Sequence, residues 1–164
     1  MTNIAAAGTV SFDRKLPTGV SWTEHKQAFL DTLVEASNLI FQQTRRATGN
    51  WVVAGVEVCN IIETLPGFVP SGATGGMGVM KIGTLQGKWD CYKDPYMTAT
   101  DFLVGYKGVS FLETGYIYAP YIPLYETPTI TLDDFVVRKA LGTQYGKKVV
   151  WDKFYCSGNV FTSP

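Results

Sequence analysis

The clearest pattern of hydrophobic and polar positions is a stripe that recurs every three or four residues between Trp22 and Ala47. The stripe consists of Trp22, His25, Phe29, Leu33, Ala36, Ile40, Thr44 and Ala47. This spacing is typical of one face of an α-helix. Ser21 and Glu24 have the capping-box spacing at its start, and Gly49 predicts its end.

The predicted helix should have more than one neighbour. Leu30, Val34 and Phe41 widen its apolar stripe, which indicates packing on more than one side. At about 1.5 Å per residue the helix would be roughly 40 Å long, which is more than a small domain beneath it can cover. We therefore expect part of its flank to be exposed or to contact another chain.

Shorter apolar runs follow the helix, separated by glycine and proline. They predict a second helix at 56–65, a flexible loop at 66–78, a connector at 125–133, and strands at 50–55, 79–85, 88–93, 102–107, 116–124, 135–141 and 147–154. Turns are predicted at Gln86-Gly87 and across 142–146. Because helices come first and strands later, without an internal repeat, the order favours an α+β fold over alternating units.

The stretch from Tyr116 to Leu124 is rich in tyrosine and proline. Tyr116 and Tyr118 would face one side of a strand and Ile117 the other. Since both sides are apolar, the pattern predicts a core strand between two layers. Pro120 and Pro123, at the far end, predict an edge, a bulge or an exit from the sheet, because proline cannot donate to a ladder. We interpret the tyrosines as structural, with hydroxyls that find local partners.

Composition narrows the function classes. The 164 residues carry a net charge of zero, 13% aromatic residues and 17% charged residues, against roughly 25% charged in an average soluble domain. A large core would explain this, and so would a surface buried against other chains. Lys147-Lys148 is too small a basic cluster for a nucleic-acid footprint. The sequence also shows no secretory signal at its start and no apolar run long enough to span a membrane.

Histidine and cysteine offer little chemistry. His25 is the only histidine and falls on the apolar stripe, so we expect a structural role. Without a second histidine, a histidine-based metal site or a Ser-His-Asp arrangement has little to build on. Cys59, Cys91 and Cys156 are widely spaced, so zinc ligation is not indicated and buried reduced thiols are expected.

Two other motifs suggest ligand binding. The Gly72–Gly78 loop resembles a phosphate-binding loop but lacks the Gly-Lys-Ser/Thr ending, and a strand is predicted after it instead of a helix. A surface loop is the simpler interpretation. Asp90 and Asp94, with Tyr92 and Tyr96 beside them, could form the acidic and aromatic cleft of a carbohydrate-binding module or a small enzyme. That remains an alternative function.

Several short motifs together carry a family resemblance. They are Thr48–Trp51, Gly87–Tyr92, Gly105–Gly108, Gly115–Tyr121 with Leu124 after it, and Thr143–Gly146. In this order, and covering about residues 22 to 150, they resemble the C-terminal portion of the major capsid proteins of T-even-like tailed phages.

The resemblance implies the Hong Kong-type phage capsid fold, with a long spine helix, an axial domain built on a mixed sheet with flanking helices, and a peripheral β-ribbon. On this basis 1–20 is an extended arm or cloning remnant and 21–49 the spine helix of the peripheral domain. Residues 50–131 are then the axial domain and 132–164 the return strands of the peripheral domain. Family members are much longer, so we expect a fragment, an engineered version or a short relative.

The same resemblance implies a structural virion protein and not an enzyme. Its copies would associate into pentamers or hexamers of an icosahedral head that encloses phage DNA, with other head proteins as further partners. It would be made in the host cytoplasm and would need no catalytic, cofactor-binding or metal-binding residues. An encapsulin-like compartment shell is a second alternative.

Overall fold

The computed structural model describes residues 7–72, 76–131 and 136–163. The chain divides into two compact units, one of Met1–Gly115 with Trp151–Pro164 and one of Tyr116–Val150. We call them the sheet unit and the ribbon unit. The expected peripheral and axial domains are defined by where each part lies in an assembled shell. The division of one chain into compact units does not test that assignment, which stays a prediction.

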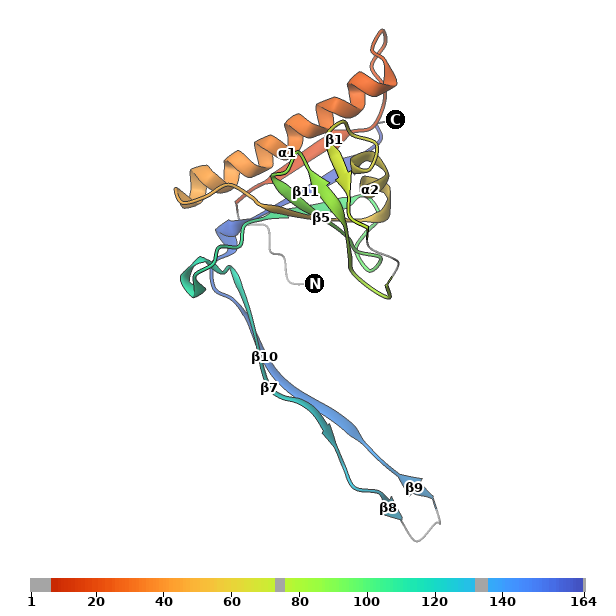
Figure 1. Ribbon diagram of the computed structural model, residues 1–164, viewed down its shortest axis with the longest axis vertical. Coiled ribbons are helices and arrows are strands. Elements are labelled where there is room, and N and C mark those ends of the chain that lie inside the picture. Colours follow the sequence, from red (N-terminus) through yellow and green to blue (C-terminus); the bar gives the residue numbers. More distant parts are fainter. Residues whose placement is uncertain (1–6, 73–75, 132–135, 164) are drawn as a thin grey trace. The chain divides into compact units, whose positions relative to one another are not determined.

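Helix α1, Trp22–Thr44, is the long predicted helix of the sheet unit (Figure 1). The capping box is confirmed: the Glu24 amide donates to Ser21 Oγ at 3.3 Å, and the Ser21 amide donates to the Glu24 carboxylate at 3.1 Å. The helix ends before Gly49, because Arg45 turns into the left-handed region at φ 53° and donates to the Phe41 carbonyl. Its 23 residues make it about 35 Å long, slightly shorter than predicted.

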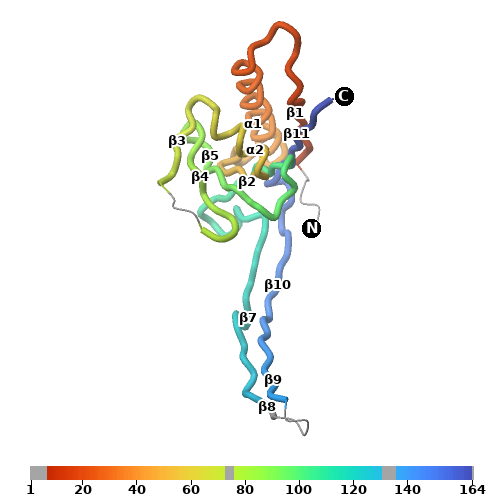
Figure 2. The backbone as a smooth tube through the Cα atoms, turned by 90° about the vertical axis from the view of Figure 1, so that its right-hand side faces the viewer, coloured from red at the N-terminus to blue at the C-terminus, as the bar shows by residue number. Residues whose placement is uncertain are grey.

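A mixed seven-stranded sheet has the order β1-β11-β6-β2-β5-β4-β3 (Figure 2). Its strands are β1 Thr9–Asp13, β2 Trp51–Ala54, β3 Phe68–Pro70, β4 Met80–Leu85, β5 Trp89–Lys93, β6 Asp101–Gly105 and β11 Tyr155–Phe161. Among the described strands, only the pairs β1–β11 and β2–β5 are parallel. With the second helix α2, Val56–Ile62, this arrangement confirms the α+β class.

One hydrophobic core holds the sheet unit together. It combines the buried stripe of α1 and the inner side of α2 with alternate residues of the strands. Among its fully buried members are Phe29 and Leu33 of α1, Val58 of α2, and Phe102 and Val104 of β6. Because both helices contribute to the same cluster, they cover the same face of the sheet.

Three strands of the sheet were not predicted. β1 lies in the stretch expected to be an extended arm, although Val10 and Phe12 alternate there as the buried positions. β3 lies in the expected loop. β11 follows the last predicted strand, 147–154, whose final residues instead form the short helix η2, Asp152–Phe154.

The ribbon unit consists of β7, Tyr116–Glu126, paired antiparallel with β10, Leu141–Val149, and of the short pair β8, Ile130–Thr131, with β9, Val137–Arg138. Residue 135, the predicted start of a strand, lies outside the described residues. The predicted turn at 142–146 is wrong, because these residues lie inside β10. Gly142 and Gly146, which indicated a turn, stand opposite Tyr125 and Ala119.

The prediction that β7 is a core strand between layers is also wrong. The described part of its unit contains only two-stranded pairs, and most β7 side chains are exposed. The proline prediction is confirmed. The register with β10 slips between Gly142 and Gln144 and again between Gln144 and Tyr145, and each slip leaves an extra residue on β7 beside Pro120 or Pro123.

Candidate functional site

His25 has a structural place. Its Nε2 donates to the carbonyl oxygen of Asp13 at 2.8 Å, and its ring stacks on Phe12 at a centroid distance of 5.1 Å. Both contacts tie α1 to β1. The ring therefore already has partners that fix it in place, as its position on the apolar stripe predicted.

The two aspartates of the suggested carbohydrate site do not form a catalytic pair. Asp90 forms an ion pair with Lys81 at 2.7 Å. Asp94 accepts from the backbone amide of Tyr96 at 2.8 Å and so closes a turn. Each carboxylate is used locally, so this arrangement does not favour the alternative of a sugar site or a small enzyme.

The cysteines are buried thiols, as predicted. Burial raises the pKa of Cys59 to about 11, of Cys91 to about 12 and of Cys156 to about 11. They therefore stay protonated at neutral pH and are poor nucleophiles and metal ligands.

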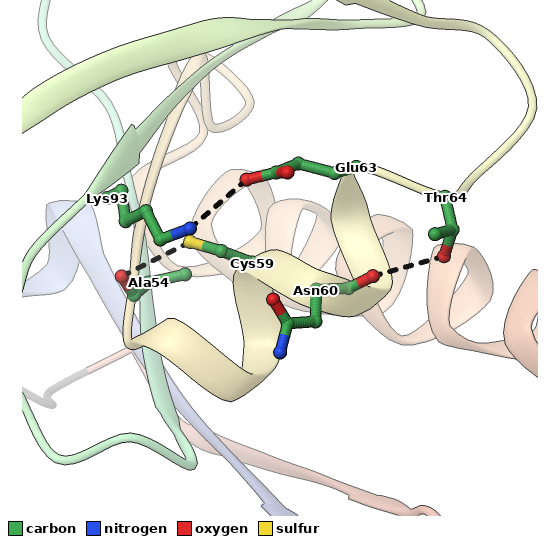
Figure 3. A network of polar contacts seen from close by, with 6 residues as sticks. All are labelled: Ala54, Cys59, Asn60, Glu63, Thr64 and Lys93. Atoms are coloured by element: carbon green, nitrogen blue, oxygen red, sulfur yellow. Dashed lines mark hydrogen bonds and ion pairs between the residues drawn. The ribbon is translucent and has the colours of Figure 1, made fainter. Parts of the chain in front are cut away.

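Polar contacts around Cys59 hold helix α2 in place (Figure 3). The Cys59 thiol donates to the carbonyl of Ala54 at 3.5 Å, while Lys93 of β5 pairs with Glu63 at the end of α2 at 3.3 Å. The Thr64 hydroxyl donates to the Asn60 carbonyl at 3.1 Å. The first two contacts join α2 to strands β2 and β5 of the sheet, and the third closes the last turn of α2.

The glycine-rich loop and a search for metal ligands add no site. Residues 73–75 of the Gly72–Gly78 loop lie outside the described residues. Across the described residues, no group of three or more potential metal ligands gathers. No helix in the same part of the chain combines the length and apolarity that crossing a bilayer requires.

The exposed apolar surface says more about function than the possible catalytic or metal-binding groups do. In the ribbon unit, Tyr118 and Tyr145 are 53% and 47% exposed, and their rings contact each other at 5.2 Å. The expectation that the tyrosine hydroxyls find local partners is wrong. The hydroxyl groups of these two residues and of Tyr116 and Tyr121 form no hydrogen bond with any described residue. The rings are thus available to another molecule.

A second exposed apolar group was missed at the sequence level. Val109, Phe111 and Leu112 lie on and beside the short helix η1, Phe111–Glu113, and each is at least 72% exposed. The loop is held firmly: the Asn50 side chain binds both the amide and the carbonyl of Lys107. The signal was present, as three large apolar residues between Gly108 and Gly115 had no helical or strand period.

The outer flank of α1 is the third such surface. An open hollow along it is lined by Asp31, Val34, Glu35, Asn38, Leu39 and Gln42. Val34 and Leu39 are partly buried against the core, whereas the four polar residues are exposed. This agrees with the expectation that the helix keeps a flank free for another neighbour.

Comparison with known proteins gives these surfaces a context. A family model described as Major capsid protein Gp23 matches residues 1–163. The major capsid protein of Vibrio phage KVP40 is 31% identical over 157 residues, covering 88% of this chain and 30% of that protein. The major capsid protein of Enterobacteria phage T4 is 31% identical over 139 residues, covering 78% of this chain and 26% of that protein. The chain thus spans less than a third of the length of these relatives.

A solved structure from Mycobacterium phage Patience shares the fold, with a TM-score of 0.53 at 12% identity over 97% of this chain and 49% of that chain. The matched relatives are phage proteins, which does not favour the alternative of a cellular compartment shell. The resemblance to the capsid proteins of T-even-like phages is confirmed by these matches. The chain belongs to the major capsid protein Gp23 family.

Proposed function

We propose that this chain is a structural part of a phage head, and that it associates with copies of itself to build the shell around the DNA. The observation that carries the proposal is the ribbon unit. An isolated two-stranded ribbon is marginally stable in water at best, yet this one exposes several large aromatic and aliphatic side chains. Such a surface needs other chains to cover it.

The low charge supports the same conclusion. With 17% charged residues, an exposed apolar group at η1 in the sheet unit and exposed tyrosines in the ribbon unit, the chain has the aromatic-rich, charge-poor surface that protein interfaces favour. No chemical step is required of any side chain. The work of the molecule is the burial of these surfaces in contacts repeated by symmetry.

We also propose the finer assignment to the Hong Kong-type capsid fold. The sheet unit would form most of the axial part of the subunit, and the ribbon unit would belong to the peripheral part. Helix α1 packs on the sheet, so its role as the spine of the peripheral domain is the assignment that most needs a test. Electron cryomicroscopy of assembled particles would give the position of α1 relative to the capsomer axis.

The self-association itself can be tested with the ribbon tyrosines. We expect the chain to form concentration-dependent oligomers in sedimentation velocity experiments and rings or shells in electron micrographs. The double variant Tyr118→Ser/Tyr145→Ser should associate about 30-fold more weakly, because the two contacting rings together form one hot spot of about 2 kcal/mol.

Tyr96→Ser is the matched control. Tyr96 is exposed in the sheet unit and makes no ring contact with a described residue, so its loss should leave association unchanged. A wild-type chain that stays monomeric at every concentration reached, while remaining folded, would contradict the proposal. Equal association of the ribbon variant and the wild type would show that these ribbon tyrosines are not part of the association surface.

A further inference from the structure

We propose that the basic, tyrosine-lined face of the ribbon unit in one copy docks on the acidic flank of α1 in a second copy. This inference rests on the proposed self-association and names the two surfaces that meet. It comes from the charges left unpaired in the described chain and from the apolar side chains beside them.

The first surface, which we call the ribbon face, is set by the β7–β10 register. Tyr116 stands opposite Val149, Tyr118 opposite Lys147, and Pro120 opposite Tyr145. Residues paired in this way lie on the same side of a two-stranded ribbon. The face therefore presents three tyrosines, a proline, a valine and one lysine.

The charge of this part of the ribbon is entirely positive. Lys147 and Lys148 are both exposed, and neither forms an ion pair or hydrogen bond through its side chain with a described residue. No acidic residue occurs in 116–120 or 145–149. Lys148 points to the opposite side from Lys147, but its long apolar stem lets its ammonium group reach around so narrow an element.

The second surface, which we call the helix flank, is negative. Asp31 and Glu35 are four residues apart on α1 and therefore neighbours on its surface, where two like charges cost an isolated helix a few tenths of a kcal/mol. Neither carboxylate has a partner among the described residues. They border the hollow that also contains Val34 and Leu39.

The acids elsewhere in the described chain do not offer a comparable surface. Most are used locally by ion pairs, turns or caps, as at Glu57, Glu63, Asp90, Asp94 and Glu126. Glu113 and Asp152 are left, each without a second free acid on the same element. The helix flank is therefore the one described surface with two adjacent unpaired carboxylates.

The two surfaces complement each other in both charge and polarity. The lysine ammonium groups meet Asp31 and Glu35, and the tyrosine rings cover Val34 and Leu39. The tyrosine hydroxyls, which lack local partners, can donate to the carboxylates or to Asn38 and Gln42. Because the two patches are different, the contact is heterologous, and repetition about a rotation axis closes a ring, as a capsomer requires.

Charge reversal tests the pairing. We expect Lys147→Glu/Lys148→Glu and, separately, Asp31→Lys/Glu35→Lys to weaken self-association about 100-fold or more, since like charges across an interface cost several kcal/mol. An equimolar mixture of the two variants should restore association, because each supplies the surface that the other needs. Combining all four substitutions in one chain should also restore it.

The controls separate the possible failures. Asp152→Lys/Lys153→Glu reverses two exposed charges elsewhere and should leave association unchanged. Circular dichroism and thermal melting check that each variant folds, and the neutral variants Asp31→Asn/Glu35→Gln and Lys147→Gln/Lys148→Gln replace any that does not, with a smaller loss expected. High salt should weaken the wild-type contact and relieve the repulsion in the single-surface variants.

Each outcome has a distinct meaning. Loss in both single-surface variants without rescue by mixing, but with rescue in the four-substitution chain, would place the contact within one chain and overturn the proposal. Unchanged association in the variants would overturn it while leaving the proposed function in place. A wild-type chain that never associates would reject the proposed function itself.

Discussion

The sheet unit and the ribbon unit of this chain solve the problem of apolar surface in opposite ways. The sheet unit buries its large apolar residues between α1, α2 and one face of the sheet. The ribbon unit carries Tyr118, Tyr121, Leu124 and Tyr125 with half or more of each side chain exposed. Since burial of apolar surface is the main favourable term in folding, we expect the first unit to be stable alone and the second to depend on a partner.

The largest effect that separates the units is expected from a large-to-small substitution in the core. Phe102 is fully buried and its ring contacts Phe29 edge to face at 5.4 Å. Phe102→Ala should lower the free energy of unfolding by about 3–5 kcal/mol, because transfer and cavity terms add. Urea denaturation followed by tryptophan fluorescence would measure the change.

Tyr121→Ala in the ribbon is the comparison. Its side chain is 78% exposed, so the dissociated chain should change by less than about 0.5 kcal/mol. A similar loss of stability for the two variants in dissociated protein would mean that the ribbon is packed within its own chain, which would remove the contrast between the units.

A smaller effect is expected where glycine lets two parts of the sheet unit approach closely. A Cβ added at Gly105 would lie 2.1 Å from the ring of Trp51, whose strand pairs with it in register. Gly105→Ala should therefore destabilise the sheet unit by about 1–3 kcal/mol through overpacking, measured by the same urea titration.

A glycine-to-alanine substitution in the ribbon should leave the free energy of unfolding unchanged or raise it. At Gly142 an added Cβ meets nothing within 4 Å, and the residue does not have a positive φ. Gly142→Ala should be neutral or stabilise by up to about 1 kcal/mol, because it restricts the unfolded chain. Destabilisation there comparable to Gly105→Ala would show that β10 is more closely packed than its exposure indicates.

The same contrast explains what could be predicted from the sequence. The period of α1 and the capping box at Ser21 are local signals, and they gave the helix start correctly. The pairing of β1 with β11 joins residues such as Thr9 and Ser157, and no local pattern reports a contact between such distant parts of the chain. In the ribbon, apolar residues on both sides of the strand indicated a core strand, and this pattern does not distinguish layers of the same chain from layers that another molecule would supply.

The candidate surfaces were harder to predict than the fold. The tyrosines of 116–121 were recognised, but the ring contact of Tyr118 with Tyr145 depends on a register that two bulges determine. Gly142 and Gly146 suggested a turn, because glycine marks turns far more often than it marks a strand in a ribbon. An exposed flank of α1 was expected from the length of the helix, but its acidic character was not, since whether Asp31 and Glu35 lack partners depends on every other charge in the fold.

The smallest effect concerns the start of α1 in the sheet unit. Ser21→Ala removes the hydroxyl that accepts from the Glu24 amide and should cost about 1 kcal/mol, the usual value for an N-cap. Ser21→Asp should recover most of it, because aspartate caps equally well, while Ser71→Ala, at an exposed site without a capping role, should stay within about 0.5 kcal/mol of the wild type. Urea titration at low protein concentration, where the chain is dissociated, isolates this local term from assembly. If Ser21→Ala instead weakened association while leaving the free energy of unfolding unchanged, the first turn of α1 would lie in the contact with a second copy. Part of the sheet unit would then also need a partner to cover it, and the contrast between the two units would not hold for α1.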